Sequence, residues 1–181
     1  MNAFSMDLTT DFFTLFQLPR AFRIDVAELD ARYLALQGEV HPDRFVGAAD
    51  ASRRRSMQWA TRVNEACQTL KKPLERAKYL LALAGYDLAA ENNTAMSPAF
   101  LMEQMEWREA VLEARSGGNL RELEHLHRRL TLDMRARYHN LAQLLDEQQD
   151  FSAASESVRH LMFLEKLRTE IDDALAFLEE A

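Results

Sequence analysis

The chain has 181 residues, with 22 Lys+Arg against 29 Asp+Glu, and therefore a net charge of −7 at pH 7. So acidic a chain is a poor match for nucleic acid, whose phosphates require a positive surface, and no apolar run approaches the roughly 18 residues that cross a membrane. One cysteine excludes an internal disulfide, and Met1–Thr10 lacks the basic flank and apolar core of a secretory signal, so we expect a cytoplasmic protein.

Four helices are predicted in residues 1–84. The first is short, lies within Phe12–Phe16 and ends before Pro19. The next two, Asp25–Val40 and Ser52–Leu70, carry apolar residues three or four positions apart, which is the spacing of one helix face. The fourth begins at Pro73, because proline is tolerated in a first turn, and ends at Gly85. The expected inner faces of the middle pair are Val26, Leu29, Tyr33, Leu36 and Val40, and then Met57, Ala60, Val63, Cys67 and Leu70.

The tripeptide His41-Pro42-Asp43 separates the two amphipathic helices. Pro42 lacks an amide hydrogen and moves His41 away from helical dihedral angles, so the preceding helix must end there. The result is a helical hairpin whose tip presents an imidazole and a carboxylate. The tripeptide could be a plain helix-breaking turn, or His41 and Asp43 could be the acid–base pair of an enzyme. The enzyme is disfavoured, because no nucleophile, phosphate-binding glycine loop or orienting third group accompanies the pair.

Residues 85–96 are predicted to be a linker, since this stretch is polar and weakly periodic. Beyond it, a helix begins after the Ser97 cap and runs to about Ser116, a second follows the Asn119 cap, and a third follows Asp150. Their expected inner residues are Leu123, Leu126, Leu130, Met134, Tyr138, Leu141 and Leu145, and then Val158, Leu161, Leu164, Leu167, Ile171, Leu175 and Leu178. No strand signal occurs, so the prediction is an all-α fold with a four-helix N-terminal unit and, in 97–181, a three-helix bundle.

The helix expected from residue 98 to about 116 has two distinct sides. At about 100° per residue, Phe100, Trp107 and Val111 point in one direction. The opposite side carries Met102, Met105, Glu106, Glu109 and Glu113. Either the two methionines pack against the other domain, or this side is a binding patch in which methionines meet an apolar surface and glutamates meet basic residues.

Three further segments accompany the tripeptide in order along the chain: Asp11–Pro19, Pro73–Leu81 and Ala99–Glu106. Together these motifs span nearly the full length and resemble the HscB-type J-domain co-chaperones of iron–sulfur cluster assembly. The J-domain is the module that activates ATP-dependent chaperones of the seventy-kilodalton class. By this resemblance, 1–84 would be a J-domain and 97–181 a domain that binds the scaffold protein on which clusters are built.

The resemblance implies two partners. His41, Pro42 and Asp43 would dock on the ATPase domain of an HscA-type chaperone and help trigger ATP hydrolysis, with positive charge supplied by Arg44 and Arg32. The IscU-type scaffold would contact Leu101, Met102, Met105, Glu106, Glu109, Glu113 and Phe163. General J-domains usually have a basic stripe before the tripeptide, whereas Gly38 and Glu39 precede it here, which suggests a specialised chaperone.

Metal ligands are not expected. Cys67 lies on the apolar face of its helix, which predicts a buried and inert thiol. His125 and His127 are two positions apart on a helix and point to different sides. We therefore predict no bound metal and no cofactor. The rival functions are a general J-domain co-chaperone that delivers unfolded clients, an enzyme or metal carrier, and a purely structural helical adaptor.

Overall fold

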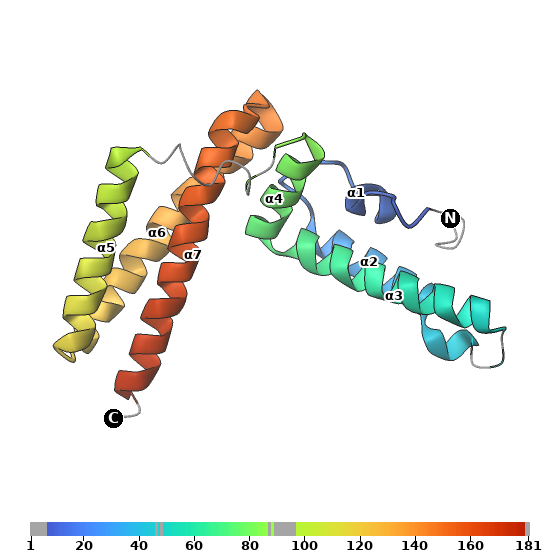
Figure 1. Cartoon of the computed structure of the whole chain (residues 1–181), viewed down its shortest axis with the longest axis horizontal. Helices are drawn as coiled ribbons and strands as arrows, with labels where there is room; N and C mark the ends of the chain where they lie inside the picture. Colours follow the sequence, from blue (N-terminus) through green and yellow to red (C-terminus); the bar gives the residue numbers. More distant parts are fainter. Residues whose placement is uncertain (1–6, 46, 48, 87, 89–96, 180–181) are drawn as a thin grey trace. The chain divides into compact units, whose positions relative to one another are not determined.

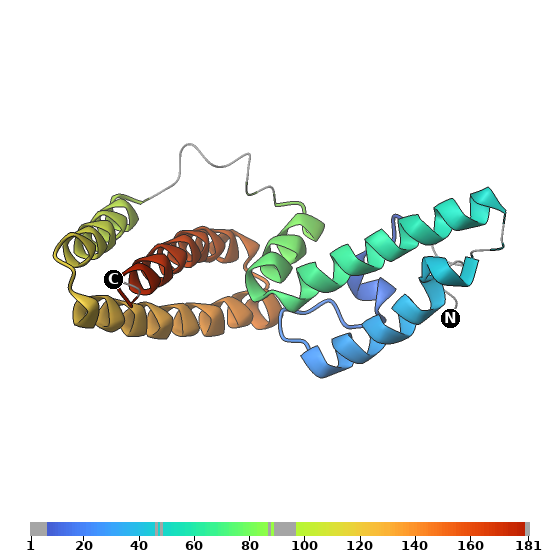
Figure 2. The same cartoon turned by 90° about the horizontal axis from the view of Figure 1, so that it is seen from below.

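The computed structural model describes residues 7–45, 47, 49–86, 88 and 97–179. Its regular elements are all helical (Figures 1 and 2), and these residues contain no strand, so the predicted all-α fold is confirmed. The chain divides into two compact units between Leu80 and Leu81. The predicted linker 85–96 stays a prediction, because residues 87 and 89–96 lie outside the described part of the chain. None of the described helices is long and apolar enough to span a membrane.

The first unit is built on a helical hairpin. Its elements are α1 (Phe12–Leu15), α2 (Val26–Val40), the 3-10 turn η2 (Pro42–Phe45), α3 (Asp50–Lys71) and the first part of α4 (Pro73–Leu83). Helices α2 and α3 lie side by side and antiparallel in both views (Figures 1 and 2). As predicted, Gly85 ends α4: its φ of +86° is the left-handed conformation that glycine adopts without steric cost.

The core of the first unit differs in two places from the predicted inner faces. Met57 and Val26 are exposed, and Trp59, which was not among the predicted inner residues, is buried. The inner face of α3 is therefore set one position away from Met57, at Ser56 and Trp59, and joins the predicted Val63 further along. The buried cluster consists of Phe12, Phe13, Leu15, Phe16, Leu18, Leu29, Val40, Trp59, Val63, Ala66, Cys67 and Leu70.

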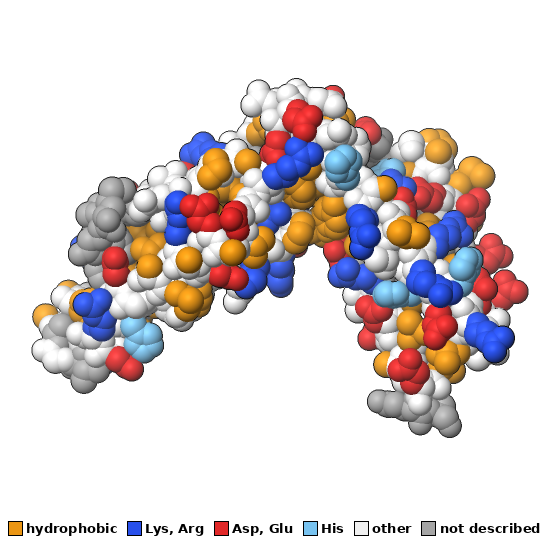
Figure 3. Space-filling view, turned by 180° about the vertical axis from the view of Figure 1, so that it is seen from behind, with side chains coloured by type: hydrophobic (Ala, Val, Ile, Leu, Met, Phe, Trp, Pro, Cys, Tyr) orange, Lys and Arg blue, Asp and Glu red, His pale blue; other side chains and the backbone are white. Residues whose placement is uncertain are grey.

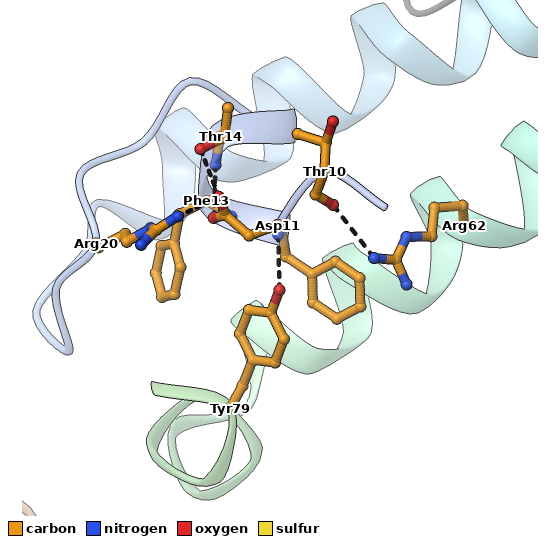
Figure 4. A network of polar contacts seen from close by, with 8 residues as sticks. Thr10, Asp11, Phe13, Thr14, Arg20, Arg62 and Tyr79 are labelled. Atoms are coloured by element: carbon orange, nitrogen blue, oxygen red, sulfur yellow. Dashed lines mark hydrogen bonds and ion pairs between the residues drawn. The ribbon is translucent and has the colours of Figure 1, made fainter. Parts of the chain in front are cut away.

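Helix α1 is only four residues long, and side chains from the rest of the unit hold it in place (Figure 4). The hydroxyl of Tyr79 accepts a hydrogen bond from the Phe12 amide (3.0 Å), and the two rings stack at 4.4 Å. Arg62 donates to the Thr10 carbonyl (3.2 Å) and lies over the Phe12 ring. The helix ends before Pro19 as predicted, but through Gln17, whose φ of 55° places it in the left-handed region.

The second unit contains the predicted three helices: α5 (Pro98–Ser116), α6 (Leu120–Gln143) and α7 (Phe151–Glu179) (Figure 1). The π-helical segment η3 (Leu144–Gln148) extends α6. Ser97 and Asn119 cap their helices as expected, each accepting a backbone N–H at 3.2 Å. The interior includes Phe100, Trp107, Val111, Leu123, Leu126, Leu130, Met134, Leu141, Leu145, Val158, Leu161, Leu164, Leu167 and Ile171.

Three predicted inner residues of the second unit are only half-buried. Tyr138 is one, because its hydroxyl reaches outward to donate to Glu165 at 2.9 Å. Leu175 and Leu178 are the other two, and Ala174 is the buried residue of the last turns of α7. A continued 3.6-residue spacing from Ile171 selects position 174 as well as 175, and the smaller side chain lies inside.

Candidate functional site

The tip of the hairpin carries the tripeptide in the predicted arrangement. His41 is the C-cap of α2, and Pro42 begins η2. The side chains of His41 and Asp43 are 51% and 84% exposed, with 3.6 Å between the imidazole Nδ1 and the nearer carboxylate oxygen. The Asp43 amide donates to the same Nδ1 at 3.3 Å. The backbone thus orients the imidazole while both functional groups remain open to a partner.

Two side chains fix the backbone at this tip. The last carbonyls of a helix have no partner within the helix. The hydroxyl of Ser56, on α3, donates to the Val40 carbonyl at 2.6 Å, and Arg44 donates to the Gly38 carbonyl at 3.0 Å. Ser56 and Val40 are both fully buried. Ser56 was not predicted, because a lone serine in a helix gives no sign of the carbonyl that it meets.

The two predicted arginines lie in different places. Arg44 belongs to η2 and is adjacent to the tripeptide. Arg32 is nine residues before His41, about 13 Å along the helix axis, and its guanidinium donates to the carbonyls of Phe16 and Gln17 and to Glu28. Arg32 therefore holds the end of α1 against α2, and the structure does not bring it to the tip.

The predicted two-sided character of α5 is present. Phe100, Trp107 and Val111 are buried, whereas Met102 and Met105 are 62% and 70% exposed. We call the exposed set the acidic–apolar face; it consists of Leu101, Met102, Met105, Glu106, Glu109 and Glu113, all exposed. In the view of the surface in Figure 3, acidic, basic and hydrophobic side chains are interspersed over the three-helix unit, and no broad basic face is visible there.

Phe163 of α7 is half-buried and is joined to α5 by two contacts. The Phe100 ring meets it edge-on at 6.0 Å, and the guanidinium of Arg108 lies 5.6 Å from the centre of its ring. At about 100° per residue, Arg108 is on the same side of α5 as Leu101. Phe163 therefore borders the acidic–apolar face beside Leu101. Arg108 was not predicted, because its contact depends on the packing of α7.

The groups considered as metal ligands are dispersed. Cys67 is buried, and burial, followed by the charge of Asp30, raises the pKa of its thiol. The imidazole of His125 lies 3.5 Å from Glu122, and that of His127 lies 3.2 Å from Asp172. Among the described residues, no three His, Cys, Asp or Glu side chains gather as metal ligands do. The expectation of no bound metal stays a prediction.

Comparison with known proteins gives consistent results. Residues 96–172 match the family model of the HSCB C-terminal oligomerisation domain. The chain is 60% identical, over 97% of its length and 99% of the relative, to the co-chaperone protein HscB homolog of Azoarcus sp. (strain BH72). The corresponding protein of Aromatoleum aromaticum is 59% identical over the same shares.

Solved structures also match over most of the chain. Chaperone HscB from Vibrio cholerae has a TM-score of 0.83 and 35% identity, and the match covers 93% of this chain and 99% of that one. Human co-chaperone protein HscB has a TM-score of 0.86 and 32% identity, with shares of 92% and 83%. The Jac1 co-chaperone of Saccharomyces cerevisiae, 22% identical with a TM-score of 0.74, shares the fold.

Proposed function

This chain belongs to the HscB family of co-chaperones, and on that premise we propose that it links an HscA-type chaperone to an IscU-type scaffold during iron–sulfur cluster assembly in the cytoplasm. The tip, His41-Pro42-Asp43, docks on the ATPase domain of the chaperone and stimulates ATP hydrolysis. The acidic–apolar face and Phe163 bind the scaffold as the client. The chain itself performs no covalent chemistry, and the proteins it resembles are named as co-chaperones.

The exposed tip supports the chaperone half of this proposal. A docking group needs a fixed geometry, and the Ser56 and Arg44 hydrogen bonds hold the Val40 and Gly38 carbonyls in the last turn before His41. The Asp43 carboxylate is 84% exposed and can accept a bidentate pair of hydrogen bonds from an arginine of the partner.

The exposed methionines are the observation that carries the scaffold half. Met102 and Met105 leave flexible, polarizable side chains in water, and Glu106 and Glu109 lie beside them. A partner with an apolar patch and basic neighbours would cover the methionines and pair with the carboxylates. Because both surfaces belong to one chain, binding the scaffold raises its effective concentration at the chaperone without any reaction by this protein.

The proposal is tested by steady-state ATP hydrolysis of an HscA-type chaperone with this protein and the scaffold. We expect this protein and the scaffold to stimulate the ATPase synergistically. The His41→Gln variant should give no stimulation, and the Met105→Ala/Glu106→Ala variant should reach the same stimulation only at a higher scaffold concentration. Losing an apolar anchor and a carboxylate together is expected to weaken scaffold binding about tenfold or more.

Matched controls use similar groups outside the two surfaces. His125→Gln removes an exposed imidazole of α6, and Leu132→Ala/Glu124→Ala removes an exposed apolar side chain and one carboxylate from the same helix. Both should behave as wild type. Stimulation that is indifferent to the scaffold would leave a general co-chaperone that delivers unfolded clients. If the His41→Gln variant still stimulates the ATPase, the tripeptide serves only as a helix-breaking turn.

A further inference from the structure

Arg137 of α6 joins all three helices of the second unit. It donates through Nε to both oxygens of Asp133 at 3.1 Å and through Nη2 to Glu103 of α5 at 2.7 Å. Its Nη1 lies 2.8 Å from Nδ1 of His160, on α7. The three partners contact different nitrogens of the guanidinium, so this one group fixes the spacing of α5, α6 and α7.

His160 connects this polar junction to the apolar side of α5. Its ring stacks on Phe100 with the centres 3.7 Å apart and the planes 7° from parallel. Phe100 in turn meets Phe163 edge-on. The first turns of α5, where Leu101 and Met102 begin the acidic–apolar face, therefore rest on the pair formed by Arg137 and His160.

The contact with Arg137 requires a neutral imidazole. A guanidinium only donates hydrogen bonds, so Nδ1 of His160 must accept, and a second proton on the ring would remove that acceptor and place two cations together. Burial, and then the charge of Arg137, lower the pKa of His160 below its ordinary value of 6.5. The carboxylates that face it, Glu103 of α5, Asp133 of α6 and Glu156 of α7, act in the opposite sense without reversing the shift.

We propose that Arg137 and His160 are positioning residues for the acidic–apolar face, and that a proton on His160 releases Arg137 and weakens scaffold binding. This inference rests on the proposed binding of an IscU-type scaffold. Neither residue needs to touch the scaffold, because both act through the placement of α5 and Phe163. By linkage, the scaffold must also disfavour the protonated form of His160, so binding should lower the pKa of this residue further.

The test follows scaffold affinity from about pH 8 down to about pH 4.5 by calorimetry with the full chain, because the lowered pKa of His160 places its titration below that of an ordinary histidine. The His160→Asn variant keeps an acceptor near the position of Nδ1 and cannot be protonated there. We expect the wild-type affinity to fall at acid pH by about fivefold more than that of His160→Asn. Because both use the same scaffold, titration of the scaffold itself cancels in this comparison.

Two further variants separate positioning from simple loss of structure. His160→Phe keeps a ring on Phe100 but has no acceptor, and Arg137→Lys keeps the charge without the planar fork. Both should bind weakly over the whole pH range with unchanged helix content. The matched control His125→Asn, at an exposed imidazole of α6, should keep the wild-type pH profile. Equal pH ratios for wild type and His160→Asn would overturn the proposal.

A measurement without scaffold separates this inference from the proposed function. The amide signals of residues 100–106 in the free protein, followed by NMR, should shift with the titration of His160 and stay unchanged in His160→Asn. If the scaffold binds neither the wild type nor the variants while these signals titrate, the proposed function is wrong, but the coupling between the protonation of His160 and the start of α5 is confirmed. If the signals do not follow His160, the coupling is wrong.

Discussion

At the residue scale, Asp11 shows how one carboxylate serves two structural roles (Figure 4). It caps α1 by accepting from the amides of Phe13 and Thr14, both at 3.1 Å, and it pairs with Arg20 at 2.7 Å. Partial burial alone would raise its pKa, but the hydrogen bonds from Arg20 and Thr14 outweigh burial, so the pKa of Asp11 lies below 3.8. The charged form is therefore the one that the fold stabilises.

Replacing Asp11 should make the acid dependence of stability visible. Asp11→Ala loses the cap and is expected to cost about 1 kcal/mol of unfolding free energy, whereas Asp11→Asn keeps a capping oxygen and costs less. The folded chain binds this proton more weakly than the unfolded chain. The advantage of wild type over Asp11→Asn is thus present above pH 3.8 and lost as the pH falls through the lowered pKa. Urea unfolding at about pH 7 and about pH 3 measures it; an equal difference at both values would contradict the assignment.

At the scale of elements, the hairpin positions its tip through contacts made by both helices. Pro42 ends α2, and Ser56 of α3 then binds the carbonyl that this ending leaves without a helical partner. Trp59 and Val63 continue the same inner face, so the packing of α3 also fixes where the Ser56 hydroxyl lies. The orientation of the tip is therefore a property of the pair α2–α3 and not of the tripeptide alone.

Ser56→Ala tests this dependence. The buried Val40 carbonyl would lose its side-chain donor, which should cost about 1 kcal/mol of unfolding free energy and reduce the stimulation of chaperone ATPase with the tripeptide intact. The control Thr61→Val removes a hydroxyl that bonds only within α3, to the Met57 carbonyl, and should leave stimulation unchanged. Full stimulation by a destabilised Ser56→Ala protein would show that the tip holds its orientation without α3.

The helices could be read from the sequence because their signals are local. Pro42, Pro73, Gly85 and the Ser97 cap each act within one turn, and the structure places helix ends beside all four. The inner faces were predicted less accurately. Trp59 was overlooked and Met57 was wrongly placed inside, because an error of one position rotates the expected inner face by about 100° around the helix axis.

The site residues divide in the same way. The exposed side of α5 followed from helical spacing, as Met102 and Met105 show. Ser56, Arg108 and Arg137 could not be found, because their contacts join helices whose packing angle and register the sequence does not state. The resemblance implied that Arg32 supplies positive charge near the tip, and its hydrogen bonds to backbone carbonyls became visible only in three dimensions.

At the scale of the whole molecule, the two surfaces belong to different compact units. Residues 1–80 carry a net charge of +2, and residues 81–181 carry −9. The change of sign coincides with the division of the chain, so the two units differ in their electrostatic environment. The tip lies at the end of α2 and in η2, and the acidic–apolar face lies on α5.

This separation predicts independent effects of mutations in the two units. His41→Gln should leave scaffold affinity unchanged, and Met105→Ala/Glu106→Ala should leave scaffold-free ATPase stimulation unchanged. In a double-mutant cycle, the effects on each quantity should add within about 0.5 kcal/mol. The measurements are calorimetric scaffold binding and ATPase rates for the four proteins of the cycle. A larger interaction energy would mean that the units communicate.

The hydrogen bond between the Phe12 amide and the Tyr79 hydroxyl spans 67 residues, and this separation has a consequence for biosynthesis. A ribosome makes α1 before the side chains that hold it: Arg32 and Arg62 follow, and Tyr79 comes almost at the end of the unit. Until Tyr79 has been made, the Phe12 ring lacks its stacking partner and the Phe12 amide lacks its acceptor, and contacts across so long a loop form slowly. The first helix to leave the ribosome thus completes its contacts only when nearly the whole unit has been made.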